Sequence, residues 1–153
     1  TKKIHQKLKR NKQKIFFGGT FSGNTFSTFM GNKILEYIKK DKSITKKMIK
    51  KAEYFQNKVN NFIFKENLNA HVYRFDTISR IVFSQKKVIN RLQRDFLEKK
   101  KISSKFRFQN FLFKKRIYFP PNGIILFSEM TTKKNIDYII KIVNSGLKKF
   151  CKT

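Results

Sequence analysis

The sequence PPNGIILF, residues 120–127, joins a strong turn signal to a buried strand and organises the second half of the chain. Proline presets φ and glycine accepts a positive φ, and both residues are favoured in tight turns. The apolar run that follows the glycine is typical of a strand buried in a sheet. We therefore predict a hairpin turn at residues 120–123 and a strand that ends near Met130.

Other segments upstream of this turn are rich in the β-branched and aromatic residues that strands favour. The predicted strands are residues 15–17, 71–75, 79–83, 106–113 and 116–119. Residues 106–113 alternate in part, as a half-buried strand does. A glycine-rich loop at residues 18–24 follows the first strand and lacks the lysine and spacing of a nucleotide-binding P-loop.

Helices are predicted where apolar residues recur on one face. In residues 45–60 this stripe consists of Met48, Ala52, Phe55 and Val59. Ser43 or Thr45 can cap this helix, whose lysines take the other faces.

Two further helices are predicted by the same pattern. The second covers residues 85–101, and its apolar face is formed by Val88, Ile89, Leu92, Phe96 and Leu97. The last helix begins after Thr131 or Thr132 and turns Ile136, Ile139, Ile140 and Val143 inward, with Gly146 in the C′ position.

The order of these elements predicts an α+β fold. We expect a mixed or antiparallel sheet with two main helices packed on it, a basic extended N-terminal arm and one extra helix. A chain of 153 residues suits one compact domain. We divide it into a basic arm that binds nucleic acid, residues 1–14, and a single α+β domain, residues 15–153.

The charge of the chain indicates a polyanionic partner. Thirty-seven Lys and Arg against nine Asp and Glu give a net charge of +28, spread over the whole length. The mutual repulsion of these positive charges is tolerated most easily when the protein binds nucleic acid. The abundance of Lys, Asn, Ile and Phe also suggests an AT-rich coding genome, organellar or otherwise.

The sequence shows no pattern of catalytic or metal-binding residues. The acidic residues do not form a catalytic pair, and His5 and His71 have no partner at metal-ligand spacing. Cys151 is the only cysteine, and residues 15–32, the longest uncharged run, are too polar to span a bilayer. We therefore expect no enzyme activity, no cofactor, no metal, no small-molecule substrate, no membrane association and no export signal.

Several short motifs in chain order resemble the large-subunit ribosomal protein sixteen family of bacteria and organelles. Residues 17–23, FGGTFSG, are similar to its Phe-Gly-x-Phe-Gly segment, and residues 44–52 to the start of its main helix. Residues 70–75 resemble a strand of the family, and residues 121–130, PNGIILFSEM, resemble its Pro-Gly-Lys-Val-Leu-Tyr-Glu-Met motif. Residues 77–105 stand in place of a glycine-rich basic loop, as a divergent loop and helix insertion.

This resemblance implies a structural, non-catalytic constituent of the large ribosomal subunit that supports translation. Its partners would be rRNA near the A-site tRNA and peptidyl-transferase region, neighbouring ribosomal proteins and A-site tRNA itself. The composition favours a mitochondrial ribosome in the matrix, with another organelle or the cytoplasm of an AT-rich organism as the alternative.

The predicted RNA-binding residues lie in the arm, on the 45–60 helix, around the central strands and near the C-terminus. They are Lys2, Lys3, His5, Lys7, Lys9, Arg10, Lys12, Lys14, Gly18, Gly19, Lys46, Lys47, Lys50, Lys51, Arg74, Arg80, Lys86, Lys87, Arg107, Lys148 and Lys149. Two other classes of protein can carry a similarly high positive charge. One is a basic DNA-binding or DNA-compacting protein, and the other is a membrane-surface protein with basic amphipathic helices.

Overall fold

The computed structural model describes residues 19 and 23–152, which fall into two units divided after Asp41. In chain order the elements are α2 (Thr25–Lys40), α3 (Ser43–Lys65), β1 (His71–Phe75), β2 (Ile78–Val82), α4 (Arg91–Lys99), α5 (Ile102–Lys114), β3 (Ile124–Leu126) and α6 (Lys133–Phe150). The predicted α+β class is confirmed, although the described residues contain five helices where we expected three. The predicted arm and the strand at residues 15–17 lie outside the described residues.

Helix α2 accounts for most of the described part of the first unit. Asn24 caps its first turn, because the side-chain oxygen of Asn24 accepts a hydrogen bond from the backbone N–H of Ser27 at 3.0 Å. No α2 residue is buried, and large apolar side chains such as Phe26 and Leu35 are exposed. The helix therefore contributes no core of its own.

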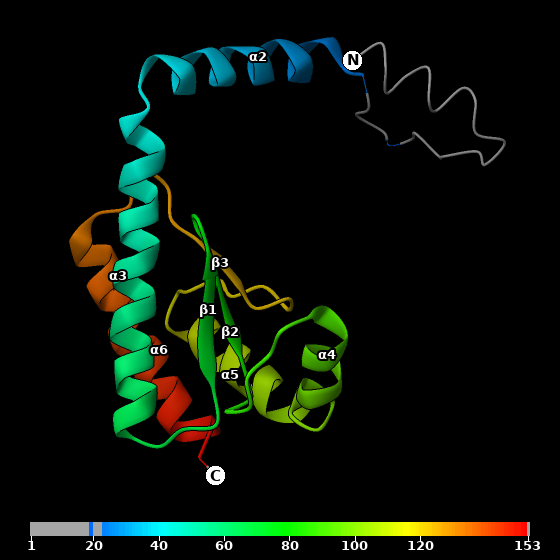
Figure 1. The fold of residues 1–153 in the computed structure, drawn as a ribbon, viewed down its shortest axis with the longest axis vertical. Coiled ribbons are helices and arrows are strands. Elements are labelled where there is room, and N and C mark those ends of the chain that lie inside the picture. Colours follow the sequence, from blue (N-terminus) through cyan, green and yellow to red (C-terminus); the bar gives the residue numbers. More distant parts are fainter. Residues whose placement is uncertain (1–18, 20–22, 153) are drawn as a thin grey trace, which may run out of the picture. The chain divides into compact units, whose positions relative to one another are not determined.

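The sheet of the second unit is antiparallel throughout, in the order β1-β2-β3 (Figure 1). β1 and β2 form a hairpin close to the predicted segments, with Tyr73 opposite Arg80. Arg80 also lies opposite Ile124 of β3, so β2 is the central strand. Sequence propensity alone located these three strands.

The turn predicted before β3 is confirmed, but the predicted hairpin and strand end are wrong, because β3 pairs with β2 and ends at Leu126, well before Met130. The backbone N–H of Gly123 donates to the carbonyl oxygen of Pro120 at 2.9 Å, and Gly123 has a φ of 76°. Its carbonyl accepts a hydrogen bond from the N–H of Ile81 at 3.1 Å. The turn is thus tied directly to the central strand.

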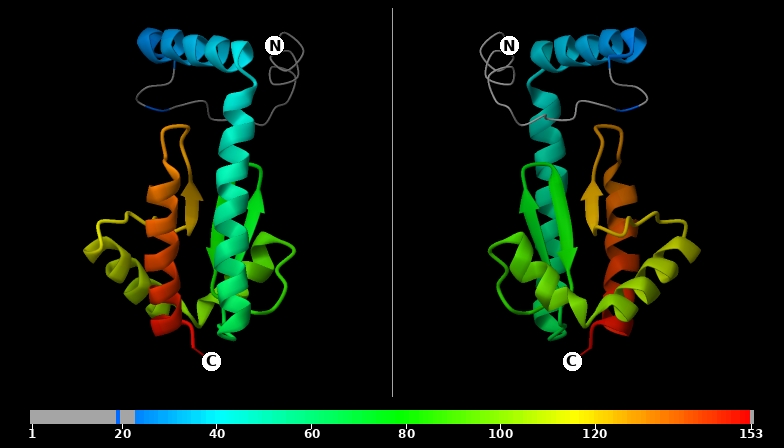
Figure 2. Two further views of the ribbon diagram at one scale, coloured as in Figure 1. Left: turned by 90° about the vertical axis from the view of Figure 1, so that its left-hand side faces the viewer. Right: turned by 90° about the vertical axis from the view of Figure 1, so that its right-hand side faces the viewer.

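Helix α3 carries the predicted apolar stripe and is longer than expected. Ala52, Phe55 and Val59 are fully buried where α3 packs on β1 and alongside α6 (Figures 1 and 2). Asn60 donates from Nδ2 to the carbonyl of Val72 at 2.9 Å and accepts from the N–H of Val72 at 2.8 Å. Because β1 is an edge strand, these bonds satisfy backbone groups that no neighbouring strand can reach.

The strand predicted at residues 106–113 is wrong, because this segment belongs to helix α5. Phe108 and Leu112, four residues apart on one helical face, are fully buried. Phe106 and Phe113 are largely exposed. The apolar residues therefore follow a period of 3.6, and the partial alternation was coincidental.

The strand predicted at residues 116–119 is also wrong. The end of α5 is closed by a reversal in which the N–H of Ile117 donates to the carbonyl of Leu112 at 3.0 Å. The N–H of Arg116 donates to the carbonyl of Phe113 at 2.9 Å, and Arg116 has a φ of 60°. This is a Schellman-type ending with a non-glycine residue in the left-handed region.

Helix α6 begins as predicted and ends later. Thr132 caps it through two hydrogen bonds with Asn135, each of 3.2 Å. The backbone N–H of Asn135 donates to Oγ1 of Thr132, and the backbone N–H of Thr132 donates to Oδ1 of Asn135. The end predicted at Gly146 is wrong, because the helix continues to Phe150. A Cβ on Gly146 would lie 2.8 Å from a ring carbon of Phe108, so this glycine permits α5 and α6 to approach closely.

Replacement of Gly146 by alanine tests this packing. We expect Gly146→Ala to lower the free energy of unfolding by about 1–3 kcal/mol, because the new methyl group collides with the Phe108 ring. Urea denaturation measures the change. Gly31→Ala is the matched control, since a Cβ on Gly31 meets nothing within 4 Å. Equal stability of Gly146→Ala and the unmodified chain would contradict the close approach.

Candidate functional site

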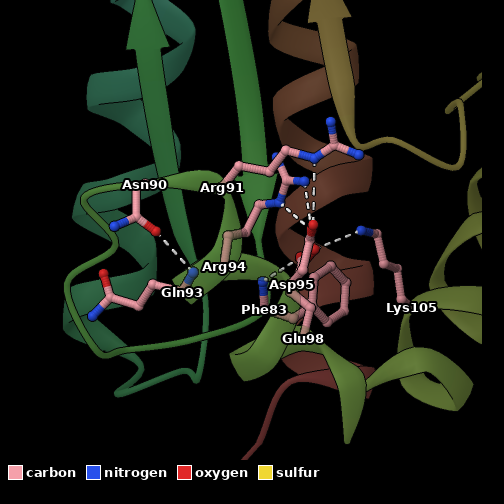
Figure 3. Close-up of polar contacts among 8 residues, drawn as sticks. All are labelled: Phe83, Asn90, Arg91, Gln93, Arg94, Asp95, Glu98 and Lys105. Atoms are coloured by element: carbon pink, nitrogen blue, oxygen red, sulfur yellow. Dashed lines mark hydrogen bonds and ion pairs between the residues drawn. The ribbon is translucent and has the colours of Figure 1, made fainter.

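Charged side chains from β2, α4 and α5 of the second unit come together at helix α4. We define the α4 cluster as Arg80 of β2, Arg91, Arg94, Asp95 and Glu98 of α4, and Lys105 of α5. Figure 3 shows five of these side chains together with the residues that position them. The cluster lies where the end of β2, α4 and the start of α5 come together.

The start of α4 is held by its own side chains. The Oδ1 atom of Asn90 accepts a hydrogen bond from the N–H of Gln93 at 2.9 Å, which caps the helix (Figure 3). Gln93 Oε1 in turn accepts from the N–H of Ile89 at 3.0 Å. The helix predicted over residues 85–101 therefore begins only at Arg91, because Asn90 stops it there.

Glu98 is the buried acid of the cluster. One of its oxygens accepts from the backbone N–H of Phe83 at 3.2 Å, and the other from Nζ of Lys105 at 2.9 Å (Figure 3). The side chains of Glu98 and Lys105 are 9% and 14% exposed. This ion pair joins β2, α4 and α5, and both carboxylate oxygens are already engaged.

Asp95 is the more exposed acid and binds two arginines. Arg94 donates from Nε to Asp95 Oδ1 at 2.9 Å, and Arg91 Nε lies 3.4 Å from Oδ2 (Figure 3). The hydrogen bond from Arg94 holds the pKa of the Asp95 carboxyl below its usual value, since it stabilises the charged form. Asp95 therefore stays an anion and is poorly suited to donate a proton.

Among the described residues, no acceptor forms a hydrogen bond with the Nε atom of Arg80, which is buried. Burial lowers the pKa of the Arg80 guanidinium, and the nearby charge of Arg94 lowers it further. With four cations and two anions in the α4 cluster, the arrangement favours binding of an anion over acid–base catalysis.

Most of the apolar face predicted for residues 85–101 is exposed to solvent. Ile89, Leu92 and Phe96 are 75%, 82% and 77% exposed, whereas Val88 and Leu97 are half-buried. Glu98 and Arg94 take the inward positions of α4, where Lys105 and Asp95 satisfy them. Sequence periodicity located the apolar stripe and did not show which side of the helix packs on the protein.

Of the predicted RNA-binding residues, those from Lys2 to Gly18 lie outside the described residues, and Gly19 is exposed. Four others make hydrogen bonds or ion pairs within the protein, while Arg107 and Lys149 lie over the ring of Phe150. Lys47 lies 3.5 Å from Glu129, Lys51 donates to the carbonyl of Ser128 at 3.3 Å, Arg74 donates to Gln56 at 3.1 Å, and Lys148 pairs with Glu66 at 2.7 Å.

The remaining predicted positions do not converge on one site. Six of them are exposed on α3, on the loop after β2, on α5 and on α6: Lys46, Lys50, Lys86, Lys87, Arg107 and Lys149. Only Arg80 among the described members of the predicted set belongs to the α4 cluster. The residues that surround it, Arg94, Asp95 and Glu98, were missed because the contacts that bring them to Arg80 come from separate elements of the fold.

Other reactive side chains are not arranged for catalysis. The ring of His71 packs against Tyr73 with 4.6 Å between ring centroids, and burial lowers the pKa of His71. Burial raises the pKa of Cys151 to about 12, so its thiol is not a nucleophile near neutral pH. Among residues 19 and 23–152, no three His, Cys, Asp or Glu side chains gather as metal ligands. Nor does any described helix combine the length and apolar character that crossing a membrane requires.

Comparison with known proteins gives a different relationship from the one that the motifs suggested. No protein-family model matches the chain. The chain is 26% identical over 136 residues to a glutamate-1-semialdehyde 2,1-aminomutase of Lachnoclostridium phytofermentans, a match that covers 88% of this chain and 31% of the relative. It is 35% identical over 75 residues to the aminomutase of Methanosphaera stadtmanae, covering 49% of this chain and 17% of that protein. The chain thus spans less than a third of the length of these curated relatives.

Solved structures show the same fold. A glutamate-1-semialdehyde aminomutase from Pseudomonas aeruginosa superposes with a TM-score of 0.73 at 17% identity, covering 92% of this chain and 31% of that one. An omega-transaminase from Sphaerobacter thermophilus gives a TM-score of 0.67 at 12% identity, covering 88% and 30%. The fold of this chain therefore recurs as about a third of larger aminotransferase-type proteins.

These findings correct our functional predictions. The resemblance to ribosomal protein sixteen is wrong, and the predicted ribosomal role, rRNA and ribosomal-protein partners and A-site tRNA contact lose their basis with it. The expectation of a protein unrelated to enzymes or small-molecule substrates is also overturned, since the relatives are named as aminomutases and transaminases. The motifs misled because they were short and drawn from a composition dominated by few residue types. That the individual cationic residues bind RNA stays a prediction.

The buried ion pair of the α4 cluster can be tested by Glu98→Gln. This change leaves the Lys105 ammonium buried without a counter-charge, and we expect a loss of about 3–5 kcal/mol in the free energy of unfolding. Glu129→Gln is the control, because the Lys47–Glu129 pair has 55% and 32% exposed side chains and should contribute about 0–1 kcal/mol. Similar small losses in both variants would show that Glu98 does not join α4 to α5.

The thiol of Cys151 gives a prediction about pH. Because burial raises its pKa from 9.0 to about 12, the uncharged thiol stabilises the folded state fully below pH 9.0, and this contribution is lost as the pH rises towards 12. At about pH 8, iodoacetamide should label Cys151 much more slowly in the native protein than in denaturant. Equal labelling rates would show that the thiol is accessible.

Proposed function

We propose that this chain is one structural part of an aminomutase or aminotransferase of the glutamate-1-semialdehyde aminomutase type. In this role it supports amino-group chemistry on small amino substrates when the rest of such a fold completes it. The observation that carries the proposal is the extent of the match, 88% of the chain in sequence and 92% in structure. A chance similarity of composition would not preserve the order of helices and strands over that length.

The surface of the chain supports a role within a larger assembly. The apolar face of α4 is open, and no residue of α2 is buried. Exposed apolar surfaces of this kind usually mark contacts with other protein. The parts of an aminotransferase-type protein that have no counterpart in this chain, about two thirds of the relatives' length, are suitable partners for them.

Two of the solved relatives are described as containing PLP or PMP, so the fit of PLP to this chain needs a test. A PLP site requires a lysine whose amine is free to bond the cofactor. Lys99 and Lys105 line a cavity of about 370 Å³ beside Pro121, but Glu98 holds the Lys105 amine at 2.9 Å and Lys99 is exposed. Neither lysine of this cavity therefore fits PLP, and we assign the cofactor to none of the described residues.

Three predictions from the sequence remain proposals. Residues 1–14 are proposed as a basic RNA-binding arm, and residues 77–105 as a divergent loop and helix insertion. The abundance of Lys, Asn, Ile and Phe, which an AT-rich coding sequence would produce, suggests an organelle or an AT-biased organism as the source. None of these is needed for the proposed role.

A chimera tests the proposed function. The stretch of the Pseudomonas aeruginosa aminomutase that superposes on this chain would be replaced by this chain. We expect a soluble protein that unfolds cooperatively and still converts glutamate-1-semialdehyde, because the fold is shared over 92% of the chain. Conversion would be followed by the rate of substrate loss.

The control carries Phe55→Asp in the inserted chain. Phe55 is fully buried, so a charge there should abolish both folding and conversion. An insoluble chimera, or a folded one whose conversion equals that of the aminomutase lacking the stretch, would contradict the proposal.

A further inference from the structure

A small pocket beside Arg80 lies apart from the apolar core. It has a volume of about 220 Å³ and lies between the β1–β2 hairpin and the start of α4. Its walls include Tyr73, Arg80, Asn90, Arg91 and Arg94. The described residues that line it include three arginines and no acid.

The acids near this pocket are already engaged with other cations. Asp95 contacts Arg91 and Arg94, and the buried carboxylate of Glu98 is neutralised by Lys105 at 2.9 Å. Neither acid forms a salt bridge with Arg80, although both lie near enough to favour its charged form. The α4 cluster therefore keeps an excess of two positive charges directed at a cavity.

The inner nitrogen of Arg80 indicates that an acceptor is needed. Its Nε–H is buried and unbonded among the described residues. A buried donor without a partner costs about 1–3 kcal/mol, and more when the group is charged. Such groups persist when a ligand or ion supplies the missing bond.

The walls of the pocket are held in place before any ligand arrives. The hydroxyl of Tyr73 accepts a hydrogen bond from the N–H of Val88 at 2.8 Å, which anchors the loop that leads into α4. Asn90 caps the helix start, where the helix dipole adds partial positive charge. The arginines thus surround a preorganised concave site.

We propose that this pocket binds a phosphate-class oxyanion, with Arg80 as the principal donor and Arg91 and Arg94 as flanking cations. A doubly charged phosphate matches the excess of two positive charges, and the Nε and terminal nitrogens of a guanidinium suit two of its oxygens. The pocket volume admits inorganic phosphate or a small phosphate monoester. This site is independent of the proposed aminotransferase role.

Calorimetric titration of the full chain with inorganic phosphate tests the site, at ionic strength held constant with chloride. The decisive comparison is Arg80→Gln against Arg107→Gln. Each variant removes one positive charge, but Arg107 is exposed on α5 and stacks on Phe150, away from the pocket lining. We expect Arg80→Gln to weaken phosphate binding by about tenfold or more, and Arg107→Gln by less than about twofold.

Equal weakening in the two variants would overturn the proposal, because it would reflect only the net charge of +28. Absence of saturable binding to the unmodified chain would overturn it as well. If Arg80→Gln fails to fold, Arg80→Lys decides. Retention of full affinity by the lysine variant would show that the guanidinium geometry has no role, whereas a loss of several-fold supports the site.

Discussion

The packing of Phe108 is the contact on which the second unit depends. Its ring is fully buried and lies edge-on to Phe83, at 5.4 Å between centroids, and to Phe119, at 5.3 Å. It also covers the backbone of Gly146 in α6. One side chain of α5 thereby contacts the end of the central strand, the segment before the turn at residues 120–123, and the C-terminal helix.

Local signals predicted the parts of the fold that need no distant partner. Three features each depend only on residues that are close in sequence: the apolar stripe of α3, the turn at Gly123 and the helix cap at Thr132. Helix α5 could not be predicted in this way, because the burial of Phe108 depends on Gly146, far along the sequence. Gly146 itself was assigned to a helix end for the same reason, since a glycine that permits close packing looks identical in sequence to one that ends a helix.

The candidate site was harder to predict than the fold. Glu98 is buried because the N–H of Phe83 and the amine of Lys105 satisfy it, and neither contact follows from helical periodicity. Arg80 was singled out for its charge, and its unbonded Nε is visible only in three dimensions. The net charge of +28 is informative about partners and solubility, and it does not determine the fold. The charge indicated only a polyanionic partner, and it was the short motifs that led to the ribosomal hypothesis, which the relationship to aminomutases overturned.

Helix α4 reverses the usual rule for a helix on a protein surface. Its apolar residues Leu92 and Phe96 face outward, while Arg94 and Glu98 face the interior. For an isolated domain this arrangement has two costs, because apolar area stays in water and charges are desolvated. Asp95 and Lys105 offset the cost of desolvating the charges. No described residue offsets the first cost, the exposure of apolar area to water. Burial of this apolar face against other protein would remove the first cost as well.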